Sequence, residues 1–372
     1  MPSNISNFSG QPASRQHTWT LAAYRNIARQ KLARSAARSL QSLAVKSWDI
    51  APGERTITPP AIYLPDQMQR VTGWEARFFP YVHPGPTMAG GIQVEHGPTR
   101  GYLLKDVWLI DGVLYKDNAS LWLSAKPRTL PGIAVEHEIE RAAIYCTQNG
   151  NSWFGTWLME DCVTYALACD EGVPVTTAPS ARLPLFTQAP PYEAWLGMNP
   201  LRLHTAFFRE LVLFDDQSHN RSRHARYRAM GDKLLSHVSH APHPGVFLLR
   251  GGAGELRLLR NELAIAEHLR TQYGFRVIDP LRNDVPTIVA ACAGARIVAG
   301  VEGSQLVHGV NVLRECGTIL TLQPPNRFVS YYKYLADRDG QHFAFAVGQP
   351  EGDGFIIDRD ELDRTLDLLP AG

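Results

Sequence analysis

Long apolar runs are missing from this chain of 372 residues. A membrane-spanning helix needs about 20 predominantly apolar residues, and because no stretch approaches that length we expect no transmembrane segment. An excess of either charge is missing as well, since 37 basic and 36 acidic side chains leave a net charge of +1. Without a positive field over the whole protein, nucleic acid is excluded as an expected partner.

Paired cysteines are also lacking. The five cysteines are odd in number and never spaced as Cys-x-x-Cys, which disfavours a disulfide framework and the common zinc sites. They are Cys146, Cys162, Cys169, Cys292 and Cys316. We therefore expect a reducing, cytoplasmic location. A hydrophobic fraction of 44% is ordinary for a folded globular protein, and the length suits roughly two to three domains.

Acidic residues are absent from Met1 to Trp48, although basic residues are frequent there. Apolar residues between Leu21 and Leu43 recur at helical spacing, so residues 1–48 are predicted to form a basic amphipathic helix. Such a helix suits an anionic membrane surface, which residues 15–46 would contact. Two alternatives are a helix packed on the protein's own body and an organelle transit peptide.

The middle of the chain changes from a β pattern to an alternating one. Residues 49–130 read as short strands punctuated by prolines, with Asp111-Gly112 suited to a type I′ hairpin, and predict a β-rich module. Residues 131–235 alternate strand and helix, which predicts a parallel sheet covered by helices in an N-terminal Rossmann-like lobe. The lobe includes a helix over about 156–169, and the basic segment 219–233 is predicted to be a solvated helix linking two domains.

Residues 236–372 show a β-α-β-α-β-α-β order, which predicts a C-terminal Rossmann-like lobe. Its strands are predicted at 246–249, 275–278, 296–299 and 318–322. Ligands of such sheets bind beyond the carboxyl ends of the strands. Gly303 and Ser304 lie where a strand turns into a helix expected to end near Arg314, a place that suits a diphosphate. The turn is neither a G-x-G-x-x-G fingerprint nor a P-loop, and many Gly-Ser turns have this geometry without a ligand.

Three segments of this region follow one another in a characteristic order. They are Phe247-Leu-Leu-Arg250, Arg260-Asn261-Glu262 and Ala295-Arg-Ile-Val-Ala-Gly300-Val-Glu-Gly303-Ser304-Gln-Leu306. The set resembles glycosyltransferase family 61, whose pattern has a strand ending in Ser-Arg, then Arg-x-x-Asn-Glu, then Gly-x-His-Gly-Ala/Ser-x-Leu. Upstream, Asn151–Asp161 looks like the family's Asn-x-Gly-His-Trp-Leu segment. The resemblance covers about residues 145–330.

This resemblance implies an α/β, GT-B-like enzyme with two Rossmann-like lobes. It would transfer a sugar from a nucleotide-diphosphate donor to a glycan acceptor with inversion and without a required metal. The pathway implied is bacterial capsule or lipopolysaccharide synthesis, at the cytoplasmic face of the membrane. Two alternatives are a catalytically degenerate sugar-nucleotide-binding subunit and a sugar-nucleotide epimerase of similar architecture.

The resemblance also assigns roles to individual residues. Arg250 would face the donor phosphates, and Glu262 would bind donor hydroxyls or orient Arg250. The other residues expected on the donor side are Arg260, Asn261, Gly303, Ser304 and Gln305. On the acceptor side, Thr156 and Trp157 match the family segment, although Thr156 replaces its histidine.

Inverting transfer needs a group that takes the proton of the acceptor hydroxyl. Glu160 and Asp161 are candidates in the N-terminal lobe, and because they point about 100° apart on a helix, at most one faces the acceptor. Glu302, which replaces the family's second histidine, is the candidate in the C-terminal lobe. A carboxylate beside a diphosphate must be neutral, paired with a cation, or turned toward the acceptor as the base.

Two Asp-x-Asp sequences match the motif of metal-dependent transferases, but nothing beyond the residue types supports a metal site there. They are Asp337-Arg338-Asp339 and Asp358-Arg359-Asp360. The second lies at a predicted helix start, where acidic residues are common for dipole reasons. We therefore expect no metal site and no cofactor.

Overall fold

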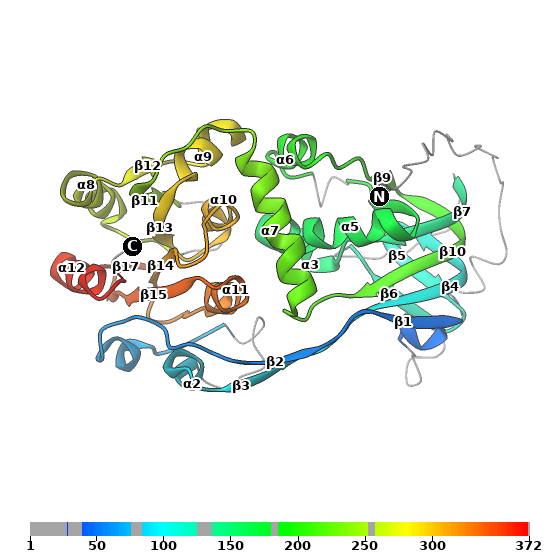
Figure 1. Cartoon of the computed structure of the whole chain (residues 1–372), viewed down its shortest axis with the longest axis horizontal. Coiled ribbons are helices and arrows are strands. Elements are labelled where there is room, and N and C mark those ends of the chain that lie inside the picture. The colour runs from blue at the N-terminus through cyan, green and yellow to red at the C-terminus, as the bar shows by residue number, and fades with distance from the viewer. Residues whose placement is uncertain are drawn as a thin grey trace, which may run out of the picture. The chain divides into compact units, whose positions relative to one another are not determined.

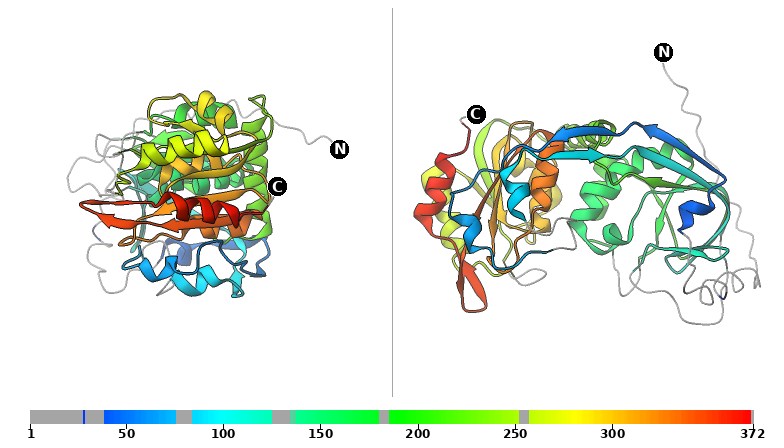
Figure 2. Two further views of the ribbon diagram at one scale, coloured as in Figure 1. Left: turned by 90° about the vertical axis from the view of Figure 1, so that its left-hand side faces the viewer. Right: turned by 90° about the horizontal axis from the view of Figure 1, so that it is seen from below.

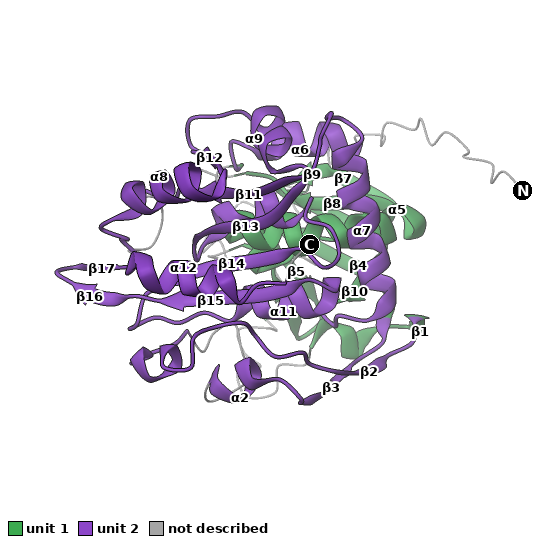
Figure 3. Cartoon of the chain, turned by 60° about the vertical axis from the view of Figure 1, so that its left-hand side comes forward, with its two compact units in different colours: residues 1–50, 100–185, 199–216 green, residues 51–99, 186–198, 217–372 purple. Residues whose placement is uncertain are grey.

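The structure is a computed structural model, and its described part forms two compact units (Figure 3). It describes residues 28, 39–75, 84–124, 135, 137–179, 185–251 and 257–370. The first unit comprises residues 1–50, 100–185 and 199–216. The second comprises residues 51–99, 186–198 and 217–372.

The units differ from the consecutive domains predicted over 49–130, 131–235 and 236–372. The reason is long-range strand pairing. Strand β4 (Thr99–Ile110) lies antiparallel to β10 (Thr205–Asp215), so the β-rich module and the alternating segment share one sheet. Most of the chain before β4, from residue 51 on, belongs instead to the unit that holds the C-terminal sheet.

The sheet of the first unit has the order β6-β5-β4-β10-β7-β8-β9, and β1 also pairs with β4. Its remaining strands are β1 (Lys46–Ala51), β5 (Val113–Lys116), β6 (Ala119–Trp122), β7 (His137–Ile144), β8 (Val173–Thr177) and β9 (Leu201–Leu203). Strands β10, β7, β8 and β9 run parallel, as the alternating pattern predicts. Asp111 and Gly112 have φ of 47° and 81°, so the type I′ hairpin between β4 and β5 is confirmed.

Four consecutive helical segments of the first unit follow β7. They are α3 (Gln148–Ser152), α4 (Phe154–Thr156), the π-helical turn η4 (Trp157–Asp161) and α5 (Cys162–Glu171). The helix predicted over about 156–169 is thus confirmed, with a π-helical turn inside it. Of the predicted N-terminal helix, residues 1–27 and 29–38 lie outside the described residues. Its predicted end is wrong, because Leu40–Leu43 form a short 3₁₀ helix (η1) and Lys46 begins a strand paired with β4.

The second unit is built on a five-stranded parallel sheet of order β12-β11-β13-β14-β15. The strands are β11 (His243–Leu248), β12 (Arg276–Ile278), β13 (Ala295–Val301), β14 (Thr318–Gln323) and β15 (His342–Val347). Numbered along the chain, this is the doubly wound order 2-1-3-4-5, whose direction reverses between its first and third strands. The reversal therefore lies between β11 and β13.

Helices cover both faces of this sheet, with α8 and α12 on one face and α9, α10 and α11 on the other (Figures 1 and 2). They are α8 (Glu262–Tyr273), α9 (Val285–Cys292), α10 (Val307–Val310), α11 (Tyr331–Asp339) and α12 (Arg359–Asp367). Ile265 and Leu269 of α8 and Leu362 of α12 are buried in one core with Phe247 of β11. This repeated strand-helix order confirms an α/β fold.

The rest of the second unit surrounds this sheet. Its elements are β2 (Glu54–Ile57), β3 (Gln93–His96), β16 (Gln349–Glu351), β17 (Gly354–Ile356), the 3₁₀ turn η2 (Gln67–Arg70), α2 (Pro84–Ala89), α6 (Ala189–Leu196) and α7 (Arg221–Leu235). The basic segment predicted as a solvated linker helix forms α7, but Arg223, Tyr227 and Leu234 on it are fully buried. None of the helices described here has the length and apolar character that crossing a membrane requires.

Candidate functional site

A candidate site lies where the strand order of the second unit reverses. Strand β11 ends at Leu248 and the chain continues to Arg250, while β13 ends at Val301 and continues into Glu302 and Gly303. Ligands of open α/β sheets bind at this reversal, outside the carboxyl ends of the strands. The residues predicted from two distant segments are thus brought to the place where a ligand is expected.

The guanidinium of Arg250 rests directly on the turn after β13. Its Nη1 donates to Oε1 of Gln305 at 3.2 Å. A Cβ atom at position 303 would lie 1.8 Å from the same Nη1, so only glycine leaves room for this guanidinium. The structure therefore places Arg250, Gly303 and Gln305 together.

The backbone of Arg250 is fixed by the first residue of α8. Glu262 accepts the Arg250 N–H at 2.8 Å through Oε1 and the Gly251 N–H at 2.9 Å through Oε2. Both carboxylate oxygens are engaged, and the side chain is mostly buried. Of the two roles that the resemblance gave Glu262, the geometry supports the orientation of Arg250.

The structure adds a second arginine, Arg257, which the sequence did not identify as part of the site. Arg257 Nη1 donates to the carbonyl oxygen of Glu302 at 2.8 Å and to the Oε2 atom of its carboxylate. The Arg257 and Glu302 side chains are only 9% and 7% exposed. In the sequence, Arg257 stands out only by its position between the glycine-rich residues 251–254 and Asn261-Glu262. We name Arg250, Arg257, Glu262 and Glu302 the arginine cluster.

The charges of the arginine cluster act on one another. Burial and the neighbouring Arg257 lower the pKa of Arg250, and Glu302 opposes that shift. If all four side chains are ionised, two positive and two negative charges sum to zero. Of the three options for Glu302 given above, the geometry shows pairing with a cation, and that cation is Arg257.

The side chains of Arg260 and Asn261, both predicted on the donor side, contact residues that are not part of the arginine cluster. Arg260 forms an ion pair with Asp353. The Asn261 amide donates to the Ile357 carbonyl at 2.8 Å and accepts the Ile357 N–H at 3.2 Å. These contacts tie the start of α8 to residues 353–357.

Ser304 begins only a short helical segment. Residues Ser304–Leu306 form the 3₁₀ turn η5, followed by α10, and the helix predicted to end near Arg314 is wrong because it ends at Val310. A macrodipole grows from many aligned peptides, so the dipole of this short segment adds little to the attraction of an anion. The positive charge at the site comes from the two guanidinium groups instead.

Asp161, in the first unit, has a structural contact at each oxygen. Its Oδ2 accepts the Thr147 N–H and its Oδ1 accepts the Thr147 hydroxyl, each at 3.0 Å. The same hydroxyl oxygen accepts the Gly150 N–H at 2.9 Å and caps α3. Asp161 therefore holds the turn between β7 and α3.

The other predicted residues of the first unit lie on α4 and η4. Thr156 ends α4, and Trp157 and Glu160 belong to the π-helical turn. Trp157 and Glu160 are buried, and the Trp157 ring lies 5.8 Å from that of Phe154. Single π-helical turns within α-helices often occur at functional sites.

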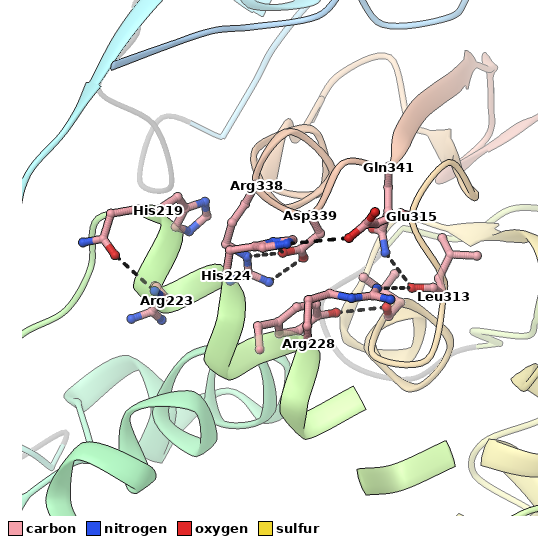
Figure 4. A network of polar contacts seen from close by, with 12 residues as sticks. His219, Arg223, His224, Arg228, Leu313, Glu315, Arg338, Asp339 and Gln341 are labelled. Atoms are coloured by element: carbon pink, nitrogen blue, oxygen red, sulfur yellow. Dashed lines mark hydrogen bonds and ion pairs between the residues drawn. The ribbon is translucent and has the colours of Figure 1, made fainter. Parts of the chain in front are cut away.

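Three of the four aspartates in the two Asp-x-Asp sequences, Asp337, Asp339 and Asp358, have protein partners. Figure 4 shows Asp339 between Arg338 and His224, with two bonds of 2.7 Å from Arg338. Asp337 pairs with Lys333. Asp358 accepts the Glu361 N–H at 3.0 Å and caps α12. Within the described residues, no three His, Cys, Asp or Glu side chains are grouped to hold a metal ion.

Comparison with known families assigns the chain. The family described as Glycosyltransferase 61 matches residues 58–319, a range that contains β11, β13 and the arginine cluster. No curated protein matches the sequence. Since the family match covers most of the chain, and the family resemblance of the Arg250 and Gly303 segments falls within it, this protein belongs to glycosyltransferase family 61.

Proposed function

We propose that this glycosyltransferase binds a nucleotide-diphosphate sugar at the arginine cluster and transfers the sugar to a glycan acceptor with inversion. The observation that carries the proposal is the meeting of Arg250 and Arg257 with the Gly303 turn at the strand reversal. Guanidinium groups match the oxygens of phosphates and bind them strongly when partly buried.

The two arginines can also stabilise the nucleoside diphosphate as it leaves. In the reaction, the acceptor hydroxyl oxygen attacks the anomeric carbon, the bond from that carbon to the diphosphate breaks, and the nucleoside diphosphate leaves with the electron pair. Arginines that contact the diphosphate stabilise the charge that develops on it. This proposal requires no metal and no cofactor.

A base must take the proton of the acceptor hydroxyl, and three carboxylates were predicted for this role. Asp161 accepts two hydrogen bonds from Thr147, and Glu302 pairs with Arg257. We propose Glu160 as the base, since it shares a turn with Trp157 and follows Thr156, the residues that the family resemblance places on the acceptor side. The first unit would then be the acceptor lobe of a GT-B-like enzyme.

The pathway and location are proposed from the family resemblance and the N-terminal sequence. Capsule or lipopolysaccharide synthesis would place the enzyme at the cytoplasmic face of a membrane, and residues 15–46 carry basic but no acidic residues. Deleting residues 1–38 should then abolish binding to vesicles of anionic lipid and leave nucleotide binding unchanged. Equal vesicle binding by the shortened chain would contradict this part of the proposal.

Two arginine variants test the donor site. Isothermal titration with UDP, GDP and ADP identifies the diphosphate that the wild-type protein binds. Arg250→Ala should weaken that binding about 30- to 100-fold, since a charge-assisted contact to phosphate contributes on the order of 2–3 kcal/mol. Arg260→Ala is the matched control and should bind normally, because Arg260 pairs with Asp353. Equal affinities for Arg250→Ala and the wild type would refute the placement of the diphosphate.

Product analysis separates the alternatives. Glycoside formation that depends on an added acceptor supports transfer. Conversion of the donor sugar without an acceptor would indicate an epimerase, and nucleotide binding without turnover would indicate a degenerate subunit.

A further inference from the structure

Tyr332, in the first turn of α11, reaches the turn that follows β13. Its hydroxyl donates to the carbonyl oxygen of Gly303 at 2.6 Å. The side chain is buried, and this burial raises the pKa of the hydroxyl well above its usual value, so it remains a proton donor at every pH used in an assay. Leu306 N–H, at 3.1 Å, is a second donor to the same carbonyl.

Two donors on the Gly303 carbonyl fix the direction of the whole peptide unit between Gly303 and Ser304. The described residues contain no cis peptide bond, and in a trans peptide the N–H points opposite to the C=O. Holding the Gly303 carbonyl toward Tyr332 therefore directs the Ser304 N–H to the other side. It also fixes the glycine against which the Arg250 guanidinium packs.

We infer that Tyr332 is a positioning residue for the donor diphosphate. It acts through the peptide between Gly303 and Ser304, by aiming the Ser304 N–H and by holding the surface under Arg250, and it does not touch the donor. This inference rests on the proposed function, since it assumes that the phosphates lie at the arginine cluster.

Tyr227 of α7 is a matched control within the same unit. It is buried like Tyr332, its hydroxyl donates to the Val310 carbonyl at 2.9 Å, and burial likewise raises its pKa well above the usual value. Its bond is made at the end of α10 and not at the Gly303 turn. Tyr332→Phe and Tyr227→Phe therefore remove the same atom and the same kind of bond, and only one of these bonds fixes the Gly303 peptide.

The experiment compares both variants with the wild type by isothermal titration with the nucleoside diphosphate that binds best and with its parent nucleoside. Thermal unfolding of each protein accompanies the titrations. Tyr332→Phe should weaken diphosphate binding about 5- to 15-fold, the effect of one lost hydrogen bond at a carbonyl that keeps another donor. Its affinity for the nucleoside should stay unchanged, because the nucleoside has no phosphate. Tyr227→Phe should lower the melting temperature and leave both affinities unchanged.

Three results would overturn the inference. Tyr332→Phe could bind the diphosphate as tightly as the wild type, lose affinity equally for nucleoside and diphosphate, or behave like Tyr227→Phe. A wild-type protein that binds no nucleoside diphosphate at all would instead refute the proposed function. The two failures are therefore distinguishable.

Discussion

Replacing Glu302 by glutamine removes one negative charge from the arginine cluster and keeps the side chain's size. Glu302 and Arg257 form a pair that is almost completely buried. With all four residues of the cluster ionised, the substitution changes the net charge from zero to +1. A nucleoside diphosphate would then meet a positive site in place of a neutral one.

The size of this effect follows from Coulomb's law. A carboxylate and a phosphate about 7 Å apart repel each other by about 2 kcal/mol at an effective dielectric constant of about 20. Removing the repulsion should tighten diphosphate binding about 30-fold. Arg257 keeps its position in the variant, since it also donates to the Glu302 backbone carbonyl at 2.8 Å and the new amide oxygen is an acceptor.

The control is Glu361→Gln. Glu361 accepts two hydrogen bonds from Arg70, at 2.6 and 2.5 Å, and this pair belongs to η2 and α12 rather than to the arginine cluster. Both substitutions should lower the free energy of unfolding by about 1–3 kcal/mol, because each removes a carboxylate that pairs with a largely buried arginine. Only Glu302→Gln should change the diphosphate affinity.

Titration calorimetry and a transfer assay decide the outcome. Tighter diphosphate binding with less than a tenfold change in turnover is the expected result. If Glu302 were the base, the variant would bind the diphosphate normally and lose transfer by roughly 10²- to 10⁴-fold. That pair of results would show that Glu302 is the base and would refute both the choice of Glu160 and the electrostatic role given to Glu302.

Three further predictions concern Gly303, His308 and the role of metal ions in transfer. Gly303→Ala should weaken diphosphate binding in calorimetry about as much as Arg250→Ala, because the new methyl group would occupy the place of the Arg250 guanidinium; unchanged binding would contradict it. Burial lowers the pKa of His308 to about 3 in the folded protein, whereas the unfolded value is about 6.5. The free energy of unfolding should therefore decrease as the pH falls from about 6.5 toward 3, by up to about 1.4 kcal/mol per pH unit. Urea unfolding of His308→Gln at several pH values should show a slope that is shallower by this amount, and equal slopes would refute the assignment. Transfer should persist in excess EDTA; loss of activity that Mn²⁺ restores would indicate a metal-dependent mechanism.

Features set by neighbouring residues could be predicted from the sequence. Aspartate is one of the residues preferred at a helix N-cap, and the Asp284 side chain accepts the Thr287 N–H at 3.0 Å at the start of α9. Glycine is the residue preferred just after a helix, and Gly274 ends α8 in the left-handed conformation at φ 68°. These signals are local, since a cap or a left-handed turn depends on a few consecutive residues. The strand-helix order of the C-terminal sheet follows from such signals.

Pairing between distant strands could not be predicted in this way. The pairing of β4 with β10 joins residues about a hundred positions apart, and no periodic pattern records which strand will be the neighbour. The same limit explains the end of the predicted N-terminal helix. Residues 46–48 continue a pattern that a helix could use, but pairing of β1 with β4 provides hydrogen bonds that a helix would otherwise supply.

The candidate site was predicted where its residues follow directly from strand ends, as Arg250 and Gly303 do. Between residues 257 and 261, the sequence did not identify the side chain that reaches Glu302. The resemblance pointed to Arg260 and Asn261, whereas Arg257 is the residue that reaches Glu302. Helix α8 begins only at Glu262, so residues 257–261 follow an irregular path. The direction of a side chain on such a path depends on tertiary contacts, here with residues 353–357, and not on sequence spacing.

Position 302 departs from the family pattern within the arginine cluster. The family pattern has histidine where this chain has Glu302, and a carboxylate at that place would repel a diphosphate. Arg257 compensates that charge directly, through a pair held by the backbone carbonyl and the carboxylate of the same residue. Arg250 still rests on Gly303, and its backbone is held by Glu262. Under the proposed function, glutamate at this position would change how strongly the site attracts phosphate, while the Arg250 guanidinium lies against Gly303.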